Sequence, residues 1–301
     1  MMNFAEFKDA VKCNIGRFLS EEYENADITF TMVNKADDKS YEALLIKKAD
    51  KSSLNVVPAL NLSEAYQEYK ASGKTIDQIC EKLASVRMNA PAPKTLEISD
   101  MLSSFENVKD RVFPKVVNRP RNIDYLKTRP HVDLTADISM IYAVRVSADA
   151  FNVASFVVDN DLMSQWKVDV STLHEAAMRN LEAEFPLIKE LAPGTPFLIL
   201  TNQRGVFGAT LMFCSKWMDD LVEHFGTLYV LPVSVHETII VPKVKVLASD
   251  MKVQDLADIV CESNGALENQ KEMLLSDHVY EYSAETHSIQ LVDVVKEEVS
   301  A

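Results

Sequence analysis

The residues best suited to chemistry lie in the segment LPVSVHETIIVP, which places Ser234, His236 and Glu237 between two strand-like runs. Imidazole titrates near neutral pH, so His236 would act as a general base oriented by a carboxylate. Asn202, in ILTNQRG, ends an earlier strand-like run and would reach the same sheet end if the two strand pairs are neighbours. A bulge in VSVH, at the end of the sheet, would re-aim these side chains. The candidate catalytic residues are therefore His236, Glu237, Ser234 and Asn202.

A structural role explains the same residues. His236 would then cap the connecting turn through a backbone hydrogen bond, and Glu237 would face solvent. The segment LSDHVY, with Ser276, Asp277 and His278, allows the same two interpretations, because Ser and Asp side chains make local turn bonds. We favour the structural role in both segments and keep the catalytic role as an alternative.

Several kinds of site are excluded by what the sequence lacks. The seven glycines are too scattered for G-x-G-x-x-G, a P-loop or a G-x-S-x-G elbow, which argues against dinucleotide, P-loop and α/β-hydrolase chemistry. Both His-Glu dipeptides lack the second histidine of H-E-x-x-H, because Met178 and Ile240 occupy its position. The four cysteines contain no C-x-x-C, so neither a disulfide framework nor a zinc knuckle is encoded. We expect no cofactor and no bound metal.

Charge is unevenly distributed along the chain. Residues 131–301 carry 11 basic and 26 acidic side chains, a net of −15, and the whole chain has a net charge of −14. Such a surface repels phosphate backbones, so we expect another protein as the partner and not a nucleic acid. Residues 109–129 form a basic run with seven basic side chains: Lys109, Arg111, Lys115, Arg119, Arg121, Lys127 and Arg129. We favour docking of this run against the acidic C-terminal half over binding of an anion or RNA.

The sequence also lacks the features of a membrane or exported protein. Its longest stretches without a charged residue, 191–203 and 224–236, have 13 residues each, whereas a membrane-spanning helix needs about 20 apolar residues. Glu6 and Asp9 fall where a secretory signal would have a basic segment and an apolar core. We therefore expect a soluble, cytoplasmic protein and no membrane partner.

Residues 1–90 are predicted to form a helix, a small antiparallel sheet and a helical pair. Apolar residues recur at helical spacing over residues 3–21, and three β-prone runs follow at 27–33, 41–48 and 54–62. Asn61 and Thr75 have the spacing of N-caps with Glu64 and Gln78, and Gly73 would end the first helix of the pair.

The middle of the chain is predicted to connect this part to a second domain. NAPAPK, residues 89–94, is the best linker candidate. A helix is expected near 96–110 and an irregular basic course from there to 131, so residues 95–131 are assigned as a basic connecting segment.

Residues 132–301 are predicted to form an α+β domain, because strand, strand and helix recur three times. We expect a mostly antiparallel sheet with helices on one face. The predicted units are ISMIYAVRV, FNVASFVVD and a helix at 169–185; PFLILTN, GATLMF and a helix at 215–225; and TLYVLPVS, ETIIVPK and a helix at 250–264, before a short helix near 267–275 and the hairpin HVYEYS and HSIQLVD.

Three strings carry a family resemblance: KVVNRPRNIDYLKTRPH with Asp137 after it, TLYVLPVSVHETIIVP, and EMLLSDHVYEYS. They resemble domain-of-unknown-function family 5688, found in Firmicutes and chiefly in Clostridia, and YEALLIKK, NLSEAYQEYKASG and GATLMF extend the likeness over nearly the whole chain. The layout of residues 142–181 is more distantly similar to the YtpQ-like family. The resemblance implies a bacterial, intracellular protein and assigns no reaction.

Three hypotheses on function remain open. We favour a non-catalytic protein with a protein-interaction or accessory role over an enzyme with a site around His236 and Glu237. The third hypothesis is an anion or RNA binder that uses residues 109–129. A pocket holding His236 beside a second titratable group would favour the enzyme, a flat exposed apolar patch would favour protein contacts, and a solvent-facing basic array would favour the third.

Overall fold

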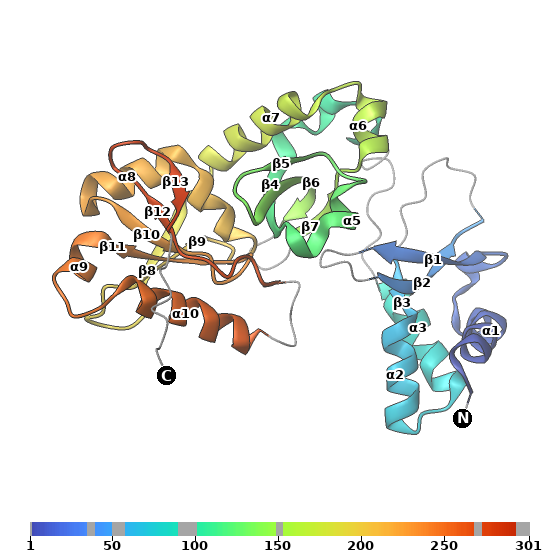
Figure 1. The fold of residues 1–301 in the computed structure, drawn as a ribbon. Coiled ribbons are helices and arrows are strands. Elements are labelled where there is room, and N and C mark those ends of the chain that lie inside the picture. The colour runs from blue at the N-terminus through green and yellow to red at the C-terminus, as the bar shows by residue number, and fades with distance from the viewer. Residues whose placement is uncertain are drawn as a thin grey trace. The chain divides into compact units, whose positions relative to one another are not determined.

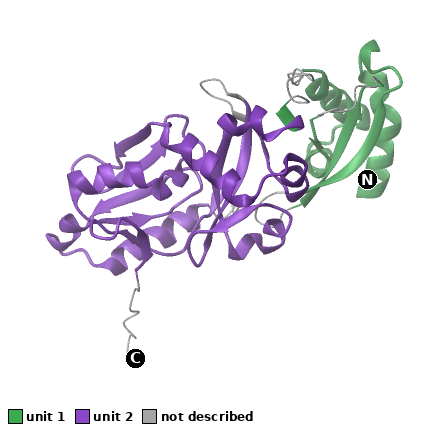
Figure 2. Ribbon diagram, turned by 90° about the horizontal axis from the view of Figure 1, so that it is seen from above, with its two compact units in different colours: residues 1–102 green, residues 103–301 purple. Residues whose placement is uncertain are grey.

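The structure is a computed structural model, and it describes residues 2–34, 40–49, 58–89, 101–148, 153–267 and 273–292. The chain divides into two compact units, Met1–Leu102 and Ser103–Ala301, coloured separately in Figure 2. Each unit has its own buried apolar clusters. The two units are therefore described one at a time.

In its described residues, unit 1 is a small antiparallel sheet packed with the helices α1, α2 and α3, with strands in the order β1-β2-β3. The first predicted helix is shorter than residues 3–21, because α1 ends at Asn14 and a 3-10 turn follows over Ile15–Phe18. Residues 54–57 of the third predicted strand lie outside the described residues, and β3 is its described end. The elements are α1 (Phe4–Asn14), β1 (Asp27–Asn34), β2 (Ser40–Lys47), β3 (Leu60–Asn61), α2 (Leu62–Ser72) and α3 (Ile76–Asn89).

The helix ends of unit 1 follow their local sequence signals. Asn61 accepts a hydrogen bond from the Glu64 N–H at 3.1 Å. Thr75 and Gln78 form both bonds of a capping box, at 3.3 and 2.9 Å. Such a cap stabilises a helix by about 1 kcal/mol. Gly73 follows α2 with a φ of 65°, a left-handed conformation that favours glycine.

Unit 2 contains two sheets, and every strand pair in them is antiparallel (Figure 1). In the four-stranded sheet β6 is central and pairs with β4, β5 and β7; in the six-stranded sheet the order is β13-β12-β10-β11-β9-β8. The predicted α+β class is confirmed. The first sheet comprises β4 (Val112–Asn118), β5 (His131–Asp133), β6 (Ile138–Ala148) and β7 (Val153–Val157), and the second β8 (Pro186–Glu190), β9 (Leu198–Asn202), β10 (Leu228–Leu231), β11 (Thr238–Pro242), β12 (Tyr280–Tyr282) and β13 (Ile289–Leu291).

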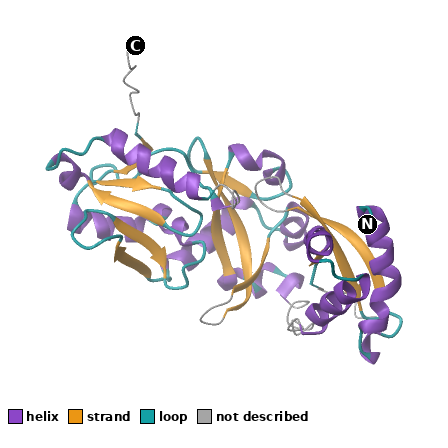
Figure 3. Cartoon of the chain, turned by 90° about the horizontal axis from the view of Figure 1, so that it is seen from below, coloured by secondary structure: helices purple, strands orange, loops and turns teal. Residues whose placement is uncertain are grey.

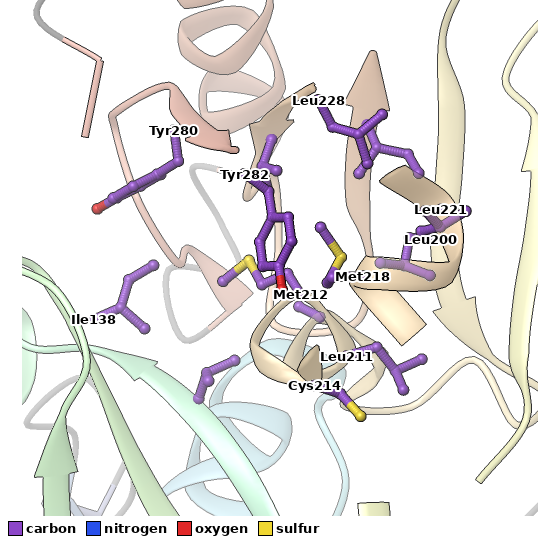
Figure 4. Packing of buried hydrophobic residues seen from close by; sticks show 14 of the residues in the cluster. Ile138, Leu200, Leu211, Met212, Cys214, Met218, Leu221, Leu228, Tyr280 and Tyr282 are labelled. Atoms are coloured by element: carbon purple, nitrogen blue, oxygen red, sulfur yellow. The ribbon is translucent and has the colours of Figure 1, made fainter. Parts of the chain in front are cut away.

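Helices cover both faces of the six-stranded sheet, which corrects the expectation that they cover one. Leu228 of β10 belongs to the apolar cluster that includes Met218 of α8 (Figure 4). Its neighbour Tyr229 belongs to the cluster that includes Leu256 of α10. Successive side chains of a strand point to opposite faces, so both faces of β10 are buried. The helices of unit 2 are α5 (Ile123–Leu126), α6 (Asn160–Trp166), α7 (Val170–Glu182), α8 (Ser215–Phe225), α9 (Lys243–Leu247) and α10 (Val253–Ala266).

The order strand, strand, helix recurs along the chain as predicted; helices and strands are coloured in Figure 3. The second of the three strand-strand-helix repeats, however, uses a different pair of strands from the predicted one. Its strands are β8 and β9, and GATLMF is a 3-10 helix, Gly208–Phe213. The prediction of a strand there was wrong because a short, fully buried apolar run has no period that separates strand from helix. Pro186 follows the helix predicted at 169–185 and is the first residue of β8. A proline is tolerated at the first position of an edge strand.

The irregular course predicted for the basic stretch is also wrong. Val112–Asn118 is strand β4, and it pairs with β6 in register from Val112↔Val144 to Asn118↔Ile138. Pro114 is tolerated within β4 because β4 is an edge strand. Lys115 is thereby placed on a sheet and not in a flexible connector.

The remaining predictions have mixed outcomes. Residues 90–100 and 268–272 lie outside the described residues, so most of the linker, the start of the 96–110 helix and the middle of the 267–275 helix are not described. The described part of the former helix includes two 3-10 turns, Phe105–Asn107 and Lys109–Arg111, in place of one long helix. The helix predicted at 250–264 is α10, Val253–Ala266, which continues through Gly265. The final hairpin is confirmed as β12 and β13.

Candidate functional site

The predicted site residues of LPVSVHE form a tight turn between β10 and β11. The Ser234 hydroxyl oxygen accepts hydrogen bonds from the N–H groups of His236 and Glu237, both at 3.1 Å. The Ser234 N–H donates to the Glu237 carbonyl at 3.3 Å. Glu237 is exposed. The Ser234 hydroxyl therefore shapes the backbone of this turn.

Asn202 ends β9, which pairs with β11, and it lies at the same sheet end as His236. Its side-chain oxygen accepts from the Arg204 and Val206 N–H groups at 3.1 and 3.3 Å, and its nitrogen donates to the Val206 carbonyl at 2.8 Å. The neighbouring Thr201 hydroxyl donates to the His236 carbonyl at 2.8 Å. The structure thus brings Asn202 and His236 to one end of the sheet, with the Asn202 amide used in the turn after β9.

Gly208 makes this close approach possible. A Cβ atom there would lie 2.3 Å from Thr201 Oγ1, 2.6 Å from the Asn202 nitrogen and 2.7 Å from the His236 carbonyl oxygen. Two of these three atoms belong to the backbone, so no rotamer change would relieve the contact. The GATLMF segment and the LPVSVHE turn pack together only because residue 208 has no side chain.

The His236 ring is held by the backbone of the opposite turn. Its Nδ1 accepts a hydrogen bond from the Phe207 N–H at 3.1 Å, and the two ring centroids lie 5.4 Å apart. Burial lowers the pKa of His236 below its ordinary value; the Glu237 carboxylate opposes this effect and Lys115 adds to it. An Nδ1 that accepts leaves the proton of the neutral ring on Nε2. His236 is therefore a neutral donor through Nε2.

Lys115 is the side chain near His236 that sequence reasoning did not single out. Its Nζ lies 3.9 Å from the centroid of the Phe207 ring and 5.4 Å from that of Phe113, and it donates to the Ser155 hydroxyl at 3.5 Å. Burial lowers the pKa of Lys115 to about 8. Within the described part of the chain, no carboxylate forms an ion pair with this amine. Two aromatic rings and one hydroxyl surround the cation.

Arg145 adds positive charge to the same face of the four-stranded sheet. Its guanidinium carbon lies 4.7 Å from the centroid of the Phe113 ring, and residue 145 pairs with Ser155 across β6 and β7. The Glu184 carboxylate contacts both Arg145, at 2.6 Å, and Arg204, at 3.6 Å. Arg145 Nε is buried and has no hydrogen-bond partner among the described residues. We call the group that surrounds the amine the Lys115 site, made of Lys115, Phe113, Arg145, Ser155, Phe207 and His236.

A second polar cluster joins the two sheets at Asp137, which precedes β6. Its carboxylate accepts from the Ser276 hydroxyl at 2.6 Å, from His278 Nδ1 at 2.9 Å, from the Thr135 hydroxyl at 3.0 Å and from the Tyr280 hydroxyl. Burial by itself would raise the pKa of Asp137, but these hydrogen bonds hold it below its ordinary value. We call these five residues the Asp137 network. Ser276 donates to the carboxylate and not to His278, so they do not form a Ser-His-Asp relay.

The comparison with family models decides the family. One model matches residues 4–192 and 183–284 of the chain, and its description is a family of unknown function, DUF5688. The chain belongs to that family. The comparisons with curated proteins and with solved structures found no match. The resemblance to family 5688 drawn from the sequence is therefore confirmed.

The strings that carry the DUF5688 resemblance meet at the two clusters. KVVNRPRNIDYLKTRPH begins with Lys115, and TLYVLPVSVHETIIVP supplies His236 to the same site. EMLLSDHVYEYS supplies Ser276, His278 and Tyr280 to the Asp137 network. Segments far apart in this DUF5688 chain therefore come together in space at the junction of the two sheets.

Other basic residues of the 109–129 stretch are neutralised in different ways. Arg119 pairs with Asp133 of the C-terminal half at 3.2 Å, as the docking prediction expects. Lys109 and Lys127 instead pair with nearby carboxylates of their own segment, Glu106 and Asp124, at 2.7 and 2.5 Å. The Arg129 guanidinium stacks over Tyr125 at 3.6 Å. Lys115 differs from Arg119, Lys109 and Lys127 because, among the described residues, its neighbours are aromatic rings and a hydroxyl and not a carboxylate.

No cluster of three or more metal-binding side chains is found among the described residues. The same part of the chain has no helix long and apolar enough to cross a bilayer.

Proposed function

We propose that this protein binds a small anion, a carboxylate or a phosphate, at the Lys115 site and that it does so without a chemical step. The observation that supports this most directly is the Lys115 amine, which is largely desolvated and has no carboxylate partner among the described residues. A buried charge without a counter-ion is destabilising by several kcal/mol. An anion that pairs with Lys115 would offset this effect.

The site offers donors suited to such a ligand. Lys115 supplies Nζ, the Ser155 hydroxyl accepts from Lys115 and retains its own proton to donate, and His236 carries its proton on Nε2. Arg145 and Arg204 share one carboxylate, Glu184, so the neighbourhood keeps an excess of positive charge. That excess lies in a unit whose C-terminal part, residues 131–301, has a net charge of −15. A local positive region in an acidic protein attracts anions.

The arrangement favours binding over catalysis. A pocket holding His236 beside a second titratable group was the feature that would support an enzyme, and Lys115 supplies only the titratable group. A hydrolytic site at this turn, however, would need the Ser234 hydroxyl bonded to the imidazole. Ser234 instead accepts two backbone N–H groups, and His236 Nδ1 accepts a third. The proposal therefore retains the non-catalytic role. A location in the bacterial cytoplasm is kept as part of the proposal on the ground of the sequence features alone.

Calorimetric titration with inorganic phosphate and, separately, with acetate tests the proposal. We expect binding of at least one of the two anions and a loss of at least about tenfold in affinity in Lys115→Met. Lys127→Met is the matched control, because Lys127 belongs to the same basic stretch and pairs with exposed Asp124; its affinity should equal that of the unsubstituted protein. Undetectable binding of both anions, or equal affinity in Lys115→Met, would refute the proposal.

A titration with single-stranded RNA distinguishes the remaining alternative. The proposal predicts no salt-sensitive RNA binding, since Arg119, Lys109 and Lys127 are paired with carboxylates. If Arg119→Ala weakens RNA binding and phosphate does not bind, the result would show that residues 109–129 bind a nucleic acid and not a small anion.

A further inference from the structure

Strand β8 is an edge strand of the six-stranded sheet and pairs only with β9 among the described strands. The Leu191 N–H donates to the Phe197 carbonyl at 2.9 Å, one residue beyond the end of β8. In an antiparallel ladder the hydrogen-bonded pairs alternate. The N–H and C=O groups of residues 187 and 189 therefore face β9, and those of Ile188 and Glu190 face away from the sheet.

These outward groups are a template for another strand. Ile188 and Glu190 offer N–H donors, and Pro186, which has none, offers a carbonyl together with those two residues. The residues of β8 become more exposed along the strand, and Ile188, Lys189 and Glu190 are exposed. Within the described residues this edge is left open to solvent.

Apolar side chains flank the open edge. Phe185 is 67% exposed, Ile188 is 39% exposed and Leu191 is 48% exposed. Phe185 also contacts the ring of Trp217 on α8, with centroids 6.0 Å apart. Three large exposed apolar residues within seven positions indicate an interaction surface more strongly than scattered ones do. A strand added at this edge would cover them while it satisfies the backbone groups of β8.

We propose that β8 docks an extended segment of a basic partner protein by β-strand addition. Charge decides between this occupant and a second copy of the chain. Of the three glutamates in residues 182–190, Glu184 pairs with Arg145 and Arg204, and Glu182 and Glu190 are exposed beside a single lysine. Residues 131–301 have a net charge of −15. Two copies would bring like charges together, whereas a segment with lysine or arginine beside apolar residues would be attracted. The inference is independent of the Lys115 site and gives a location to the protein-interaction hypothesis.

A defined probe tests the docking. The probe is a fluorescent, acetylated peptide of eight residues in which valine and lysine alternate, and its binding to the full chain is followed by anisotropy. We expect saturable binding, lost by at least about tenfold when the peptide is N-methylated, because methylation removes its backbone donors. A glutamate-valine peptide of the same length should bind at least about tenfold more weakly than the lysine peptide.

Variants of β8 locate the contact. Ile188→Pro removes one outward N–H and leaves the bonds to β9 in place, and Ile188→Lys keeps the backbone but repels a basic peptide; each should weaken binding at least about tenfold. Leu247→Ser is the control, since Leu247 is 74% exposed on α9, and its affinity should be unchanged. The proposal is overturned if the lysine peptide does not bind, if it binds both Ile188 variants as tightly as the unsubstituted protein, or if sedimentation shows a dimer that Ile188→Pro dissociates.

Discussion

The Asp137 network and the Lys115 site are two charged groups placed between the same two sheets, and they are satisfied very differently. Asp137 is 6% exposed and accepts hydrogen bonds from four side chains. Lys115 has one long hydrogen bond, to Ser155, and otherwise faces aromatic rings. The Asp137 carboxylate is fully hydrogen-bonded within the protein, whereas Lys115 has no counter-ion in the part of the chain that the structure describes.

This difference separates a structural group from a binding group. A buried carboxylate with four donors fixes how β6 and β12 meet, so its contribution is to stability. A desolvated amine without an acid partner is destabilising, and such groups are found preferentially at functional sites. The comparison predicts opposite effects on stability when the two charges are removed.

Removal of the Asp137 carboxylate should have the largest effect. Asp137→Ala leaves the Ser276 and Tyr280 hydroxyls buried without their acceptor, so we expect a loss of about 3 kcal/mol in the free energy of unfolding. Urea denaturation measures it. Asp124→Ala is the control, because that carboxylate is 75% exposed and paired only with Lys127 among the contacts described; it should change stability by about 0.5 kcal/mol or less. If Asp137→Ala and Asp124→Ala reduce the free energy of unfolding by similar amounts, the Asp137 network contributes no more to stability than an exposed ion pair.

A side chain at Gly208 should have the next largest effect. Gly208→Ala forces apart the end of β9 and the His236 turn, which we expect to reduce the free energy of unfolding by about 2 kcal/mol. Gly16→Ala is the matched control, since nothing lies within 4 Å of a Cβ there, and it should leave stability nearly unchanged. Denaturation of both variants gives the comparison, and an unaffected Gly208→Ala protein would contradict the close packing of these two segments.

Removal of the Lys115 charge should stabilise the protein. At neutral pH Lys115→Met is expected to raise the free energy of unfolding by about 1 to 2 kcal/mol, because it removes a desolvated charge without a counter-ion. Burial lowers the pKa of Lys115 from 10.5 to about 8, so the unfolded chain binds more protons than the folded one between these values. The unsubstituted protein should therefore gain stability relative to Lys115→Met as pH rises through that window. A destabilised Lys115→Met protein would show that the amine is already satisfied.

Two serine substitutions give the smallest and most closely matched test. Ser276 is 1% exposed and donates a hydrogen bond to Asp137. Ser276→Ala removes this buried donor and should reduce the free energy of unfolding by about 1 to 2 kcal/mol. Ser155→Ala removes only the 3.5 Å contact to Lys115 and should change it by about 0.5 kcal/mol or less. Thermal unfolding in parallel resolves the difference, and equal effects would argue that both clusters are structural.

Much of the fold was predictable from local signals, and the errors have physical causes. The caps at Asn61, Gly73 and Thr75 act within a few residues, and the sequence alone placed those helix ends. GATLMF was misassigned because all of its residues except Phe213 are buried, which removes any period. β4 was missed because its pairing with β6, which makes it an edge strand, is not a local property of the sequence.

The candidate site was predictable only in part. The proximity of Asn202 and His236 followed from the expectation that neighbouring strand pairs share a sheet end. Lys115 looked like one of seven basic residues, because neither its burial nor its aromatic neighbours are local properties of the sequence. A catalytic role for His236, Glu237, Ser234 and Asn202 stays a prediction.

Titration of the Lys115 amine by side-chain NMR, with its signal assigned by comparison with Lys115→Met, tests the account most directly. The chain is labelled at lysine and titrated first without added anion and then with saturating inorganic phosphate or acetate. We expect the pKa of Lys115 to be near 8 without added anion. It should be higher with phosphate or acetate bound, because a bound anion favours the charged amine. A pKa near 10.5, the ordinary lysine value, under every condition would contradict it.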